Sequence, residues 1–463
     1  MPSSNREPPS NTPFGGREPP SNPIYVESPR TTFNQPRLDW QLQKNLSKSL
    51  SSLSPKLLSF KCVALGVDDA ADWVYRGEGA ANIVLAYSGS SPSLIGKVMR
   101  LRKTPTKSGS HKLKSSKALT EHERLLWKDV VELVSSSNKE GAEQLYVQHV
   151  MKPLLGSKNV DAGMNVLVSG EFLESVEKRC NRQRPTWRVD AAQVDKNFNS
   201  VLLMSDHSLF PHGNLEAAPC ISIEIKPKCG FLPLSRFISD ETAIKRSITR
   251  FKMHQALKLH QGEIAELSQY NPLDLFSGSK ERIQKAIKDL FATPQNNFRV
   301  FFNGSLIFGG LGGGAPATSC QIAKAFDNAL KFVIQADDGL YTEKLLNLVA
   351  ETLHKSGVLD QLLEVQKLDH IDIEGAIHAY YNIISQPCLV CRELSEEQSK
   401  RYTSLHSASL EESLRTVKNY LIAATVKDCS LIVCFRPRKE GYSESVCNRI
   451  YFESTKQTFD FKV

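Results

Sequence analysis

The chain has 463 residues, of which 40% are hydrophobic and 23% charged, and Lys and Arg outnumber Asp and Glu by 58 to 50. This length predicts two or three domains or lobes, and without an apolar run of membrane-spanning length we expect no transmembrane helix. The net charge of +8 is compatible with an anionic ligand but does not require one, because most surface charge is simply solvated. Ten cysteines are too few for a disulfide scaffold, and no secretory signal opens the sequence. We therefore expect a reducing compartment, the cytoplasm or the nucleus.

Residues 1–66 differ in composition from the rest. Ten of the 23 prolines lie in the first 60 positions, and the hexapeptide at Arg6–Asn11 is repeated at Arg17–Asn22. Such a segment cannot bury enough apolar surface to offset its ordering entropy, so we expect a disordered Pro/Ser-rich extension. An organelle transit peptide is the alternative, because Ser49–Ser54 lies among lysines, but several acidic residues weaken it.

The folded part is expected to begin near residue 67 with a β-rich half. Asp72–Lys103 reads as strand, turn, strand and strand, and residues 103–116 form a basic, Ser-rich loop. A helix follows that carries Leu119, Leu126, Val130 and Val134 on one face. Further strands are expected at Val166–Val168, Trp187–Val189, Val201–Met204 and Cys220–Ile225.

The second half is expected to be more helical. Ile244, Ile248 and Phe251 share a helix face, and Asn297–Phe302 reads as a strand. The glycine-rich stretch Gly304–Gly314 predicts a flexible loop rather than a phosphate loop, because no Lys-Ser/Thr pair follows it. A last amphipathic helix carries Leu410, Leu414, Val417 and Leu421 up to Asp428, and the buried strand Cys429–Phe435 follows it. The pattern predicts an α+β protein of two lobes, with a ligand in the cleft between them.

The first candidate binding segment is Arg76-Gly-Glu-Gly-Ala-Ala-Asn82, between two expected strands. Glycine allows close backbone approach, so successive N–H groups there can face an anion. The next strand carries Lys97 and Arg100 on opposite faces, and a cation from it could reach nucleotide phosphates. A hairpin turn flanked by surface cations explains the same residues, so this segment alone leaves both interpretations open.

A second candidate is Glu224-Ile-Lys-Pro-Lys228, at the end of an expected strand. Alternation places Glu224, Lys226 and Lys228 on one face if the strand continues, and Pro227 indicates an edge or a strand end. One acid and two bases suit a junction of metal, nucleotide and phosphate. A surface salt-bridge cluster fits the composition as well.

Other polar residues are scattered along the sequence. Asp428, between a helix and a strand, could accept a hydroxyl proton in phosphoryl transfer, or could simply end the helix. Taken singly, the others fit turns or solvated charges: Arg188, Lys258, Asn296, Asn297 and Arg299.

Four residues have metal-ligand spacing, namely His378, Cys388, Cys391 and His406, which form an H-x9-C-x2-C-x14-H pattern. Two thiolates and two imidazoles match a tetrahedral structural zinc site with no position left for a catalytic water. Two buried thiols and two surface histidines are the alternative. A bound zinc would contribute directly to the folding of this region.

Together these segments resemble one family, the plant-type inositol-pentakisphosphate 2-kinases. The resemblance extends from about residue 70 to 463. The segments that match the family most clearly are Asp72–Tyr87, Glu224–Pro233, Arg250–Gln255, Thr293–Arg299 and Ala424–Ser430. It implies a two-lobed α+β inositol phosphate kinase fold, distantly similar to protein kinases. Residues 67–185 would form the nucleotide-binding N-lobe, and residues 186–463 the inositide-binding C-lobe with a structural zinc. The implied reaction transfers the γ-phosphate of ATP, with Mg²⁺, to the 2-hydroxyl of inositol 1,3,4,5,6-pentakisphosphate, and its product is phytate.

The resemblance also implies residue roles. Asp428 would be the base facing the 2-hydroxyl. The nucleotide would contact Gly79, Ala80, Ala81, Asn82, Lys97, Arg100, Ser205, Asp206, His207, Glu224 and Lys226. The inositol phosphates would contact Arg188, Lys228, Lys258, Asn296, Asn297 and Arg299, and zinc the four His and Cys residues above.

The resemblance also concerns the end of the sequence. In the family, a segment with an Asp-Leu-x-x-Lys-Pro type motif, whose aspartate binds the nucleotide's metal, follows the counterpart of Thr458–Val463. The sequence here stops short of it, so we expect weak or no kinase activity from this form. Comparing phytate formation by this chain and by one extended with that segment tests the expectation.

Five phosphates place a charge of roughly −8 to −10 on such a substrate, which only a cleft lined by many fixed cations can hold. The alternative function is a non-catalytic module that binds inositol polyphosphates or phosphoinositides through the same basic cleft. A zinc-containing nucleic-acid binder is disfavoured, because the basic residues are dispersed among acids and stacking platforms are not evident. We expect a monomer with no nucleic-acid partner and no membrane insertion.

Overall fold

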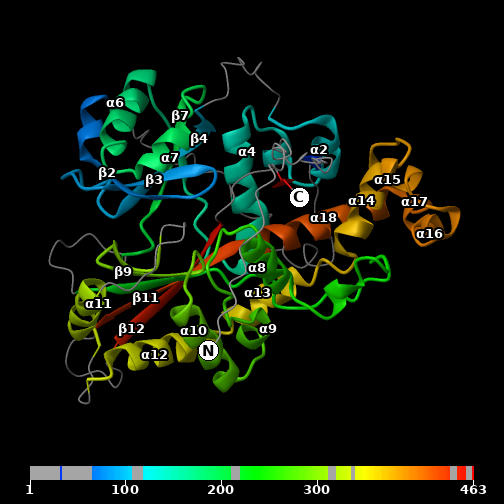
Figure 1. Cartoon of the computed structure of the whole chain (residues 1–463). Coiled ribbons are helices and arrows are strands. Elements are labelled where there is room, and N and C mark those ends of the chain that lie inside the picture. The colour runs from blue at the N-terminus through cyan, green and yellow to red at the C-terminus, as the bar shows by residue number, and fades with distance from the viewer. Residues whose placement is uncertain are drawn as a thin grey trace, which may run out of the picture.

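The computed structural model describes residues 32–33, 65–106, 118–209, 219–310, 320–334, 339–437, 446–454 and 461–462. Most of the expected disordered extension (1–66) and most of the expected basic loop (103–116) lie outside the described residues. Within the described part, no helix has the length and apolar character needed to cross a membrane. The chain has a mixed α/β fold with two larger antiparallel sheets, each with a core of its own, and a short pair of β1 (Thr32–Phe33) with β13 (Phe461–Lys462) (Figure 1).

The first sheet has the strand order β2-β3-β4-β7-β5, with β6 paired to β4. Ile83 and Leu85 are fully buried and their neighbours are less so, because side chains alternate between the two faces of a strand. Helix α6 (Gly170–Cys180) covers the buried face and contributes Phe172 and Val176 to the core. The strands are β2 (Trp73–Glu78), β3 (Asn82–Tyr87), β4 (Lys97–Pro105), β5 (Met164–Leu167), β6 (Ala192–Val194) and β7 (Ser200–Ser205).

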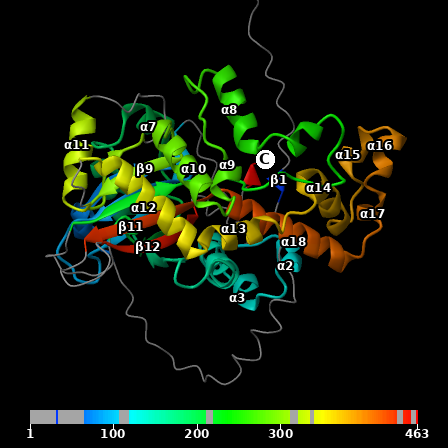
Figure 2. The same ribbon diagram turned by 90° about the horizontal axis from the view of Figure 1, so that it is seen from below.

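The second sheet has the order β10-β9-β8-β11-β12, and every neighbouring pair is antiparallel. Its central strand β8 is buried on both faces, with Ile221, Ile223 and Ile225 on one face and Ser222 and Glu224 on the other. Helices α10–α13 lie along this sheet, as the view from below shows (Figure 2). The strands are β8 (Ile221–Ile225), β9 (Phe298–Phe302), β10 (Ser305–Phe308), β11 (Cys429–Pro437) and β12 (Val446–Ser454). The helices are α10 (Lys280–Ala292), α11 (Cys320–Lys331), α12 (Tyr341–Ser356) and α13 (Val358–Gln366).

Three sequence expectations about helices and strands are wrong. The single helix through Leu119–Val134 is broken into α2 (Glu121–Leu126) and α3 (Val131–Val134), because Trp127 and Asp129 turn inward, where Asp129 accepts a hydrogen bond from the buried Lys418 at 3.1 Å. The helix through Ile244 and Phe251 is likewise a 3₁₀ turn, Ala243–Arg246, followed by α8 (Arg250–His260). The 3₁₀ turn ends with Ser247 as its C-cap, and Thr249 caps α8, since its side chain accepts from the Lys252 N–H.

The expected strand Trp187–Val189 is instead helix α7 (Thr186–Ala191), which has no buried residue. Arg188 stacks on the exposed Trp187. The expected loop Gly304–Gly314 contains strand β10 in its described part, and residues 311–314 lie outside it. Strands β6 and β7 belong to the first sheet, whereas α3 and the residues Leu119 and Trp127 on either side of α2 contribute to the core of the second. Residues from both sides of position 186 thus contribute to each core, and the expected division into lobes at that position stays a prediction.

The remaining helices extend from the second sheet. Helix α18 (Leu410–Lys427) runs to Asp428 and leads directly into β11, as the sequence predicts. At its far end, a group of short helices forms the extremity of the molecule (Figure 1). The others are α4 (Lys139–Tyr146), α5 (Lys152–Leu155), α9 (Pro272–Leu275), α14 (Asp372–Ile383), α15 (Leu389–Arg392), α16 (Glu396–Lys400) and α17 (Thr403–His406), with a π-helical turn at Val147–Met151.

Candidate active site

A cluster of charged side chains lies where strands β8 and β9 meet the start of β11. Antiparallel pairing sets Glu224 opposite Arg299 on one side and Ile432 on the other. Arg299 Nη1 is 3.1 Å from a Glu224 carboxylate oxygen, and Ser430 Oγ donates to the other oxygen at 2.9 Å. The register of three strands thus brings together residues about 75 and 206 positions apart. We call Glu224, Lys226, Lys228, Arg299 and Asp428 the charged cluster.

Glu224 keeps its charge although it is buried. Burial alone would raise the pKa of its carboxyl, but Arg299, Lys226 and the Ser430 hydroxyl together hold that pKa below its ordinary value. Lys226 is less well compensated than Glu224. Burial lowers the pKa of its ammonium, and the neighbouring cations Lys228 and Arg299 lower it further, against the attraction of Glu224. The cluster therefore contains a fixed anion surrounded by cations, which is suited to organising a polyphosphate ligand.

Strand β8 ends at Ile225, so the expected alternation does not continue through Lys228. Lys228 instead adopts a left-handed backbone with φ 63°. This turns its ammonium toward the end of α18, where Nζ lies 3.4 Å from Asp428 Oδ1. Glu224, Lys226 and Lys228 do lie close enough for their charges to interact, as expected. A turn after β8, rather than one face of a continuing strand, brings Lys228 to this position.

Arg100 on β4 connects the charged cluster with the first sheet. It is 7% exposed, and burial lowers the pKa of its guanidinium to about 10, against the opposing attraction of Glu224 and Asp161. It therefore remains charged at neutral pH. Asp161 in turn lies 3.3 Å from His207, and that contact, with two backbone N–H donors, holds the pKa of Asp161 far below its usual range despite burial.

The segment after β7 forms a second polar group. Lys97 Nζ donates to Ser205 Oγ at 3.2 Å, and Asp206 accepts from the Ser208 N–H and pairs with Arg76 at 3.1 Å. Asp206 and His207 are both buried. The residues expected to line the nucleotide hinge are thus adjacent and rigidly held.

The expected nucleotide turn is the tight connection between β2 and β3. The Gly79 N–H donates to the Asn82 carbonyl at 2.9 Å, so the hairpin itself uses that donor. A Cβ at Gly79 would meet no atom within 4 Å, which leaves open space beside the turn. Ala80 and Ala81 lie at its tip, and the buried Glu78 before it is held by Arg184 and Lys103 at 3.0 and 2.8 Å.

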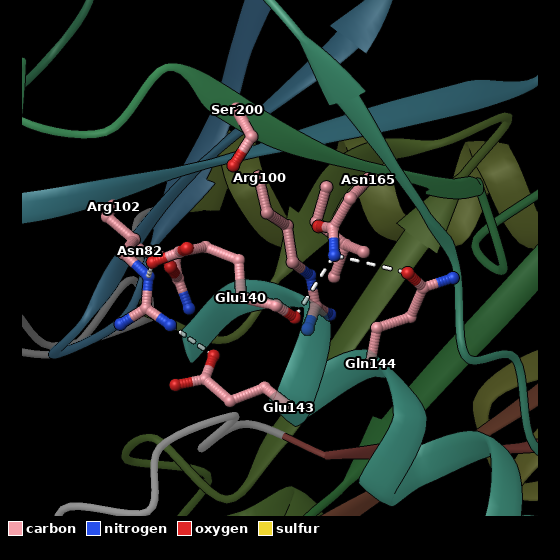
Figure 3. A pocket seen from close by; sticks show the side chains of 9 residues that line it. Asn82, Arg100, Arg102, Glu140, Glu143, Gln144, Asn165 and Ser200 are labelled. Carbon is pink, nitrogen blue, oxygen red and sulfur yellow. Dashed lines mark hydrogen bonds and ion pairs between the residues drawn. The ribbon is translucent and has the colours of Figure 1, made fainter. Parts of the chain in front are cut away.

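A polar pocket lies between the first sheet and α4 (Figure 3). Asn82 and Arg100, both expected to bind nucleotide, lie in its wall, and Arg102 pairs there with Glu143. Burial raises the pKa of Glu143 to about 7, although Arg102 opposes the shift. The remaining lining residues are Glu140, Gln144, Asn165, Ser200 and Leu202.

Helix α8 brings further cations toward the charged cluster. His254 has its pKa lowered by partial burial and then by Lys258, Arg250 and Lys228, which places Lys228 and the helix side by side. Lys258 also contacts Glu263 at 3.4 Å. The Asn297 carbonyl accepts from the Lys226 N–H at 2.9 Å, and Asn297 is 3% exposed, so its backbone supports the cluster.

Four potential metal ligands converge between α14 and α17. The ligand atoms of His378, Cys388, Cys391 and His406 all lie within 4.8 Å of one another. His378 Nδ1 is 3.1 Å from His406 Nε2 and 3.3 Å from Cys388 Sγ. Burial, followed by the neighbouring His406, lowers the pKa of His378 to about 4, which leaves its imidazole neutral and able to donate a lone pair. This donor set fits zinc.

Comparisons with known proteins agree with this geometry. The family model for inositol-pentakisphosphate 2-kinase matches residues 75–463. An inositol-pentakisphosphate 2-kinase of Arabidopsis thaliana is 55% identical over 397 residues, which cover 85% of this chain and 88% of that protein. One of Oryza sativa subsp. indica is 48% identical, covering 86% and 89%, and one of Danio rerio is 30% identical, covering 80% and 84%. The chain belongs to the inositol-pentakisphosphate 2-kinase family.

Two further residues expected to bind the inositol phosphates in this family member are Arg188 and Asn296. Arg188 lies on α7 with its guanidinium 4.2 Å above the Trp187 ring and close enough to influence Tyr75. Asn296 lies in the turn before β9. Their roles stay predictions.

Sequence reasoning about this kinase family member missed several groups that shape the site. Arg76 and Ser430 lie within the segments that carry the resemblance, and their side chains contact Asp206 and Glu224. Asp161, Tyr270 and Gln366 carry no local signal, because each reaches the site from a distant part of the chain. Their contribution appears only from contacts in the folded protein.

Proposed function

We propose that this protein transfers the γ-phosphate of ATP to the 2-hydroxyl of inositol 1,3,4,5,6-pentakisphosphate and so forms inositol hexakisphosphate. Family membership supports the reaction, and the charged cluster around Glu224 and Asp428 is the observation that carries it. Fixed cations surround both acids, as a substrate of high negative charge requires.

We infer that the two sheets correspond to two lobes with the nucleotide between them. Arg100 supports this arrangement, because it comes from the first sheet and interacts with Glu224 of the second. The adenine would contact Ser205, Asp206 and His207. The phosphates would contact Arg100, Lys226 and the turn at Gly79–Asn82. Lys97, bonded to Ser205, would support the hinge.

On the inositide side, Lys228, Lys258 and Arg299 would bind phosphates, with Arg188, Asn296 and Asn297 completing the set. Charge-assisted hydrogen bonds of about 1.5–3 kcal/mol each would supply affinity and orientation. Arg299 would serve both ligands, since its side chain already contacts Glu224.

Asp428 would act as the base. The 2-hydroxyl oxygen would form a bond to the γ-phosphorus, the bond from that phosphorus to the bridging oxygen of ADP would break, and the hydroxyl proton would pass to the Asp428 carboxylate. Lys228 Nζ, 3.4 Å away, would hold that carboxylate in position. Such a reaction depends on positioning and electrostatics and needs no covalent intermediate.

Mg²⁺ would neutralise charge on the transferring phosphate. The described residues contain one group of three or more His, Cys, Asp or Glu side chains able to share an ion, and that is the His–Cys group far from the charged cluster. Mg²⁺ readily keeps several waters and phosphate oxygens among its ligands. We therefore infer that it arrives with ATP, with Glu224 and Asp428 as the nearby carboxylates. The His–Cys group would hold a structural zinc.

The non-catalytic alternative has no specific observation in its favour, because the family model and the relatives named above are all kinases by description.

Incubation with Mg²⁺–ATP and inositol pentakisphosphate, followed by anion-exchange separation, tests the proposal. Family membership replaces the expectation of weak or no activity: we expect inositol hexakisphosphate from the wild-type chain and a rate lower by about 10³-fold or more from Asp428→Asn. If Asp428→Asn still binds the inositide, the substitution affects the phosphoryl-transfer step and not substrate binding. Equal rates for the two proteins would contradict the assignment of Asp428, and inositide binding without any product would favour the non-catalytic alternative.

A further inference from the structure

The backbone of residues 226–230 has no strand partner, yet it carries Lys226 and Lys228 of the proposed site. Strand β8 ends at Ile225, and Lys228 has φ 63°, a left-handed conformation that disfavours residues with a Cβ. Such a conformation persists only where surrounding contacts fix it. The contacts that hold this segment therefore determine where the Lys228 ammonium lies.

Four backbone groups of this segment are bonded from outside it. The Lys226 N–H donates to the Asn297 carbonyl at 2.9 Å, and the buried Tyr270 hydroxyl donates to the Pro227 carbonyl at 2.7 Å. The other two groups, the Lys228 carbonyl and the Gly230 N–H, both bond to the side chain of Gln366, each at 2.8 Å.

Gln366 is the last residue of α13 and is fully buried. Its Nε2 donates to Lys228 and its Oε1 accepts from Gly230, so only one orientation of the amide satisfies both bonds. The pair of bonds spans Cys229 and fixes the chain on both sides of the turn. A Cβ on Gly230 would approach Phe276 within 2.4 Å, so the turn also packs too closely to shift in that direction.

We propose that Gln366 is a positioning residue for the inositide site, which acts by holding Lys228 in its left-handed conformation, with Tyr270 as a second support. This inference rests on the proposed function of Lys228. Gln366 contacts neither ligand. Its amide sets the place from which the Lys228 ammonium reaches both Asp428 and a substrate phosphate.

Gln366→Met keeps the length of the side chain and removes both hydrogen bonds. We expect kcat/KM for inositol pentakisphosphate to fall about tenfold or more, mainly through KM, because two buried backbone groups lose their partner and the turn relaxes. The KM for ATP should change by less than about twofold, since the nucleotide contacts lie elsewhere. Hydrogen exchange at the Gly230 amide should accelerate, which is a readout independent of activity.

Gln361→Met is the matched control. Gln361 lies in the same helix, and its amide also donates to a backbone carbonyl, that of Leu154 at 3.0 Å, away from the charged cluster. It should leave the inositide KM unchanged. An effect of Gln366→Met no larger than that of Gln361→Met, or an equal loss for ATP and inositide, would overturn the proposal.

Gln366→Glu gives a further test that a merely structural role would not pass. A protonated carboxyl can reproduce the amide by donating to Lys228 and accepting from Gly230, whereas the carboxylate only accepts. Burial raises the pKa of such an acid. The kcat/KM of this variant relative to wild type should therefore fall as the pH rises, and a flat ratio would contradict the proposal.

Two more variants keep the outcome decisive if Gln366→Met does not fold. Tyr270→Phe removes one hydroxyl and should raise the inositide KM in the same direction. Lys228→Met tests the proposed function separately. If Lys228→Met behaves like wild type, the role of Lys228 is wrong and this inference falls with it. If Lys228→Met is impaired while Gln366→Glu and Tyr270→Phe are not, only this inference is overturned.

Discussion

At the scale of single residues, burial affects two glutamates in opposite ways. Glu224 and Glu143 are both buried, but the pKa of Glu224 is lowered and that of Glu143 is raised to about 7. Two cations and a hydroxyl compensate Glu224, whereas for Glu143 the compensation by Arg102 is smaller than the effect of burial. The partners that the fold supplies, more than burial itself, decide whether a carboxylate stays charged.

Arg299→Met tests this compensation. Removing the first cation at Glu224 leaves a buried carboxylate with fewer partners, and we expect a destabilisation of about 3 kcal/mol in denaturant unfolding. Arg282→Met is the control, because Arg282 forms a similar ion pair with Asp274 while its side chain is 53% exposed. It should cost less than about 1 kcal/mol. Similar losses of stability in both variants would contradict the view that Arg299 compensates the buried charge of Glu224.

Glu143→Gln tests the pH dependence of the other acid. A carboxyl with a raised pKa binds more protons in the folded state, so its contribution to stability decreases as the pH rises from about 4.5 to 7. The substitution keeps the side chain neutral at all pH values. We expect the melting temperature of Glu143→Gln relative to wild type to be higher at pH 8 than at pH 5. A difference that does not change with pH would contradict the shift.

At the scale of elements, helix α18 links two distant features. Its last residue, Lys427, bonds to the buried Asp369 at 2.5 Å, and this contact fixes the helix end from which Asp428 projects. At its other end lie the short helices with the His–Cys group. The helix has 18 residues, so the two features are separated by about 27 Å.

Cys391→Ser tests the proposed zinc site at that far end. We expect the loss of about one zinc per chain by elemental analysis and a melting temperature lower by at least about 4 °C, because bound metal contributes directly to folding. Well below the melting temperature, kcat should change less than about twofold, since the separation along α18 is large. Cys180→Ser is the control, because Cys180 is buried in the core of the first sheet and should leave the zinc content unchanged. Zinc retained by Cys391→Ser would exclude this ligand set.

At the scale of the whole molecule, a few side chains connect the two sheets. Arg76 of the first sheet pairs with Asp206 and also lies against Gly304, in the turn between β9 and β10 of the second. A Cβ on Gly304 would lie 2.6 Å from an Arg76 guanidinium nitrogen. The absence of a side chain at Gly304 therefore allows this contact between the sheets.

Gly304→Ala should displace Arg76 and disturb Asp206 of the proposed nucleotide hinge. We expect the KM for ATP to rise at least about threefold, consistent with partial loss of one ion pair. Gly278→Ala is the control, since Gly278 has a similar φ of 72° with no atom within 4 Å of its Cβ position. Both variants should lose about 1 kcal/mol of stability from backbone strain. An ATP KM that is unchanged in Gly304→Ala would show that the contact does not affect the hinge.

Patterns over a few neighbouring residues are enough to predict the features that depend on short spacing. Strands β2, β3, β4, β5 and β7 of the first sheet, strand β8, the α18–β11 junction and the four potential metal-ligand positions follow from alternation, helical periodicity and His/Cys spacing. Strand β6 does not. The sequence also predicts that Glu224, Lys226 and Lys228 lie together, but it predicts one strand face where the structure has a turn.

How these pieces meet depends on contacts between distant parts of the chain. The breaks after Leu126 and before Thr249 come from a buried ion pair and a helix cap, which override the periodic pattern. The left-handed turn at Lys228 depends on Gln366, 138 residues away, and no local propensity encodes that contact. The sequence supplied the charged groups of the site, and long-range hydrogen bonds in the folded protein placed them.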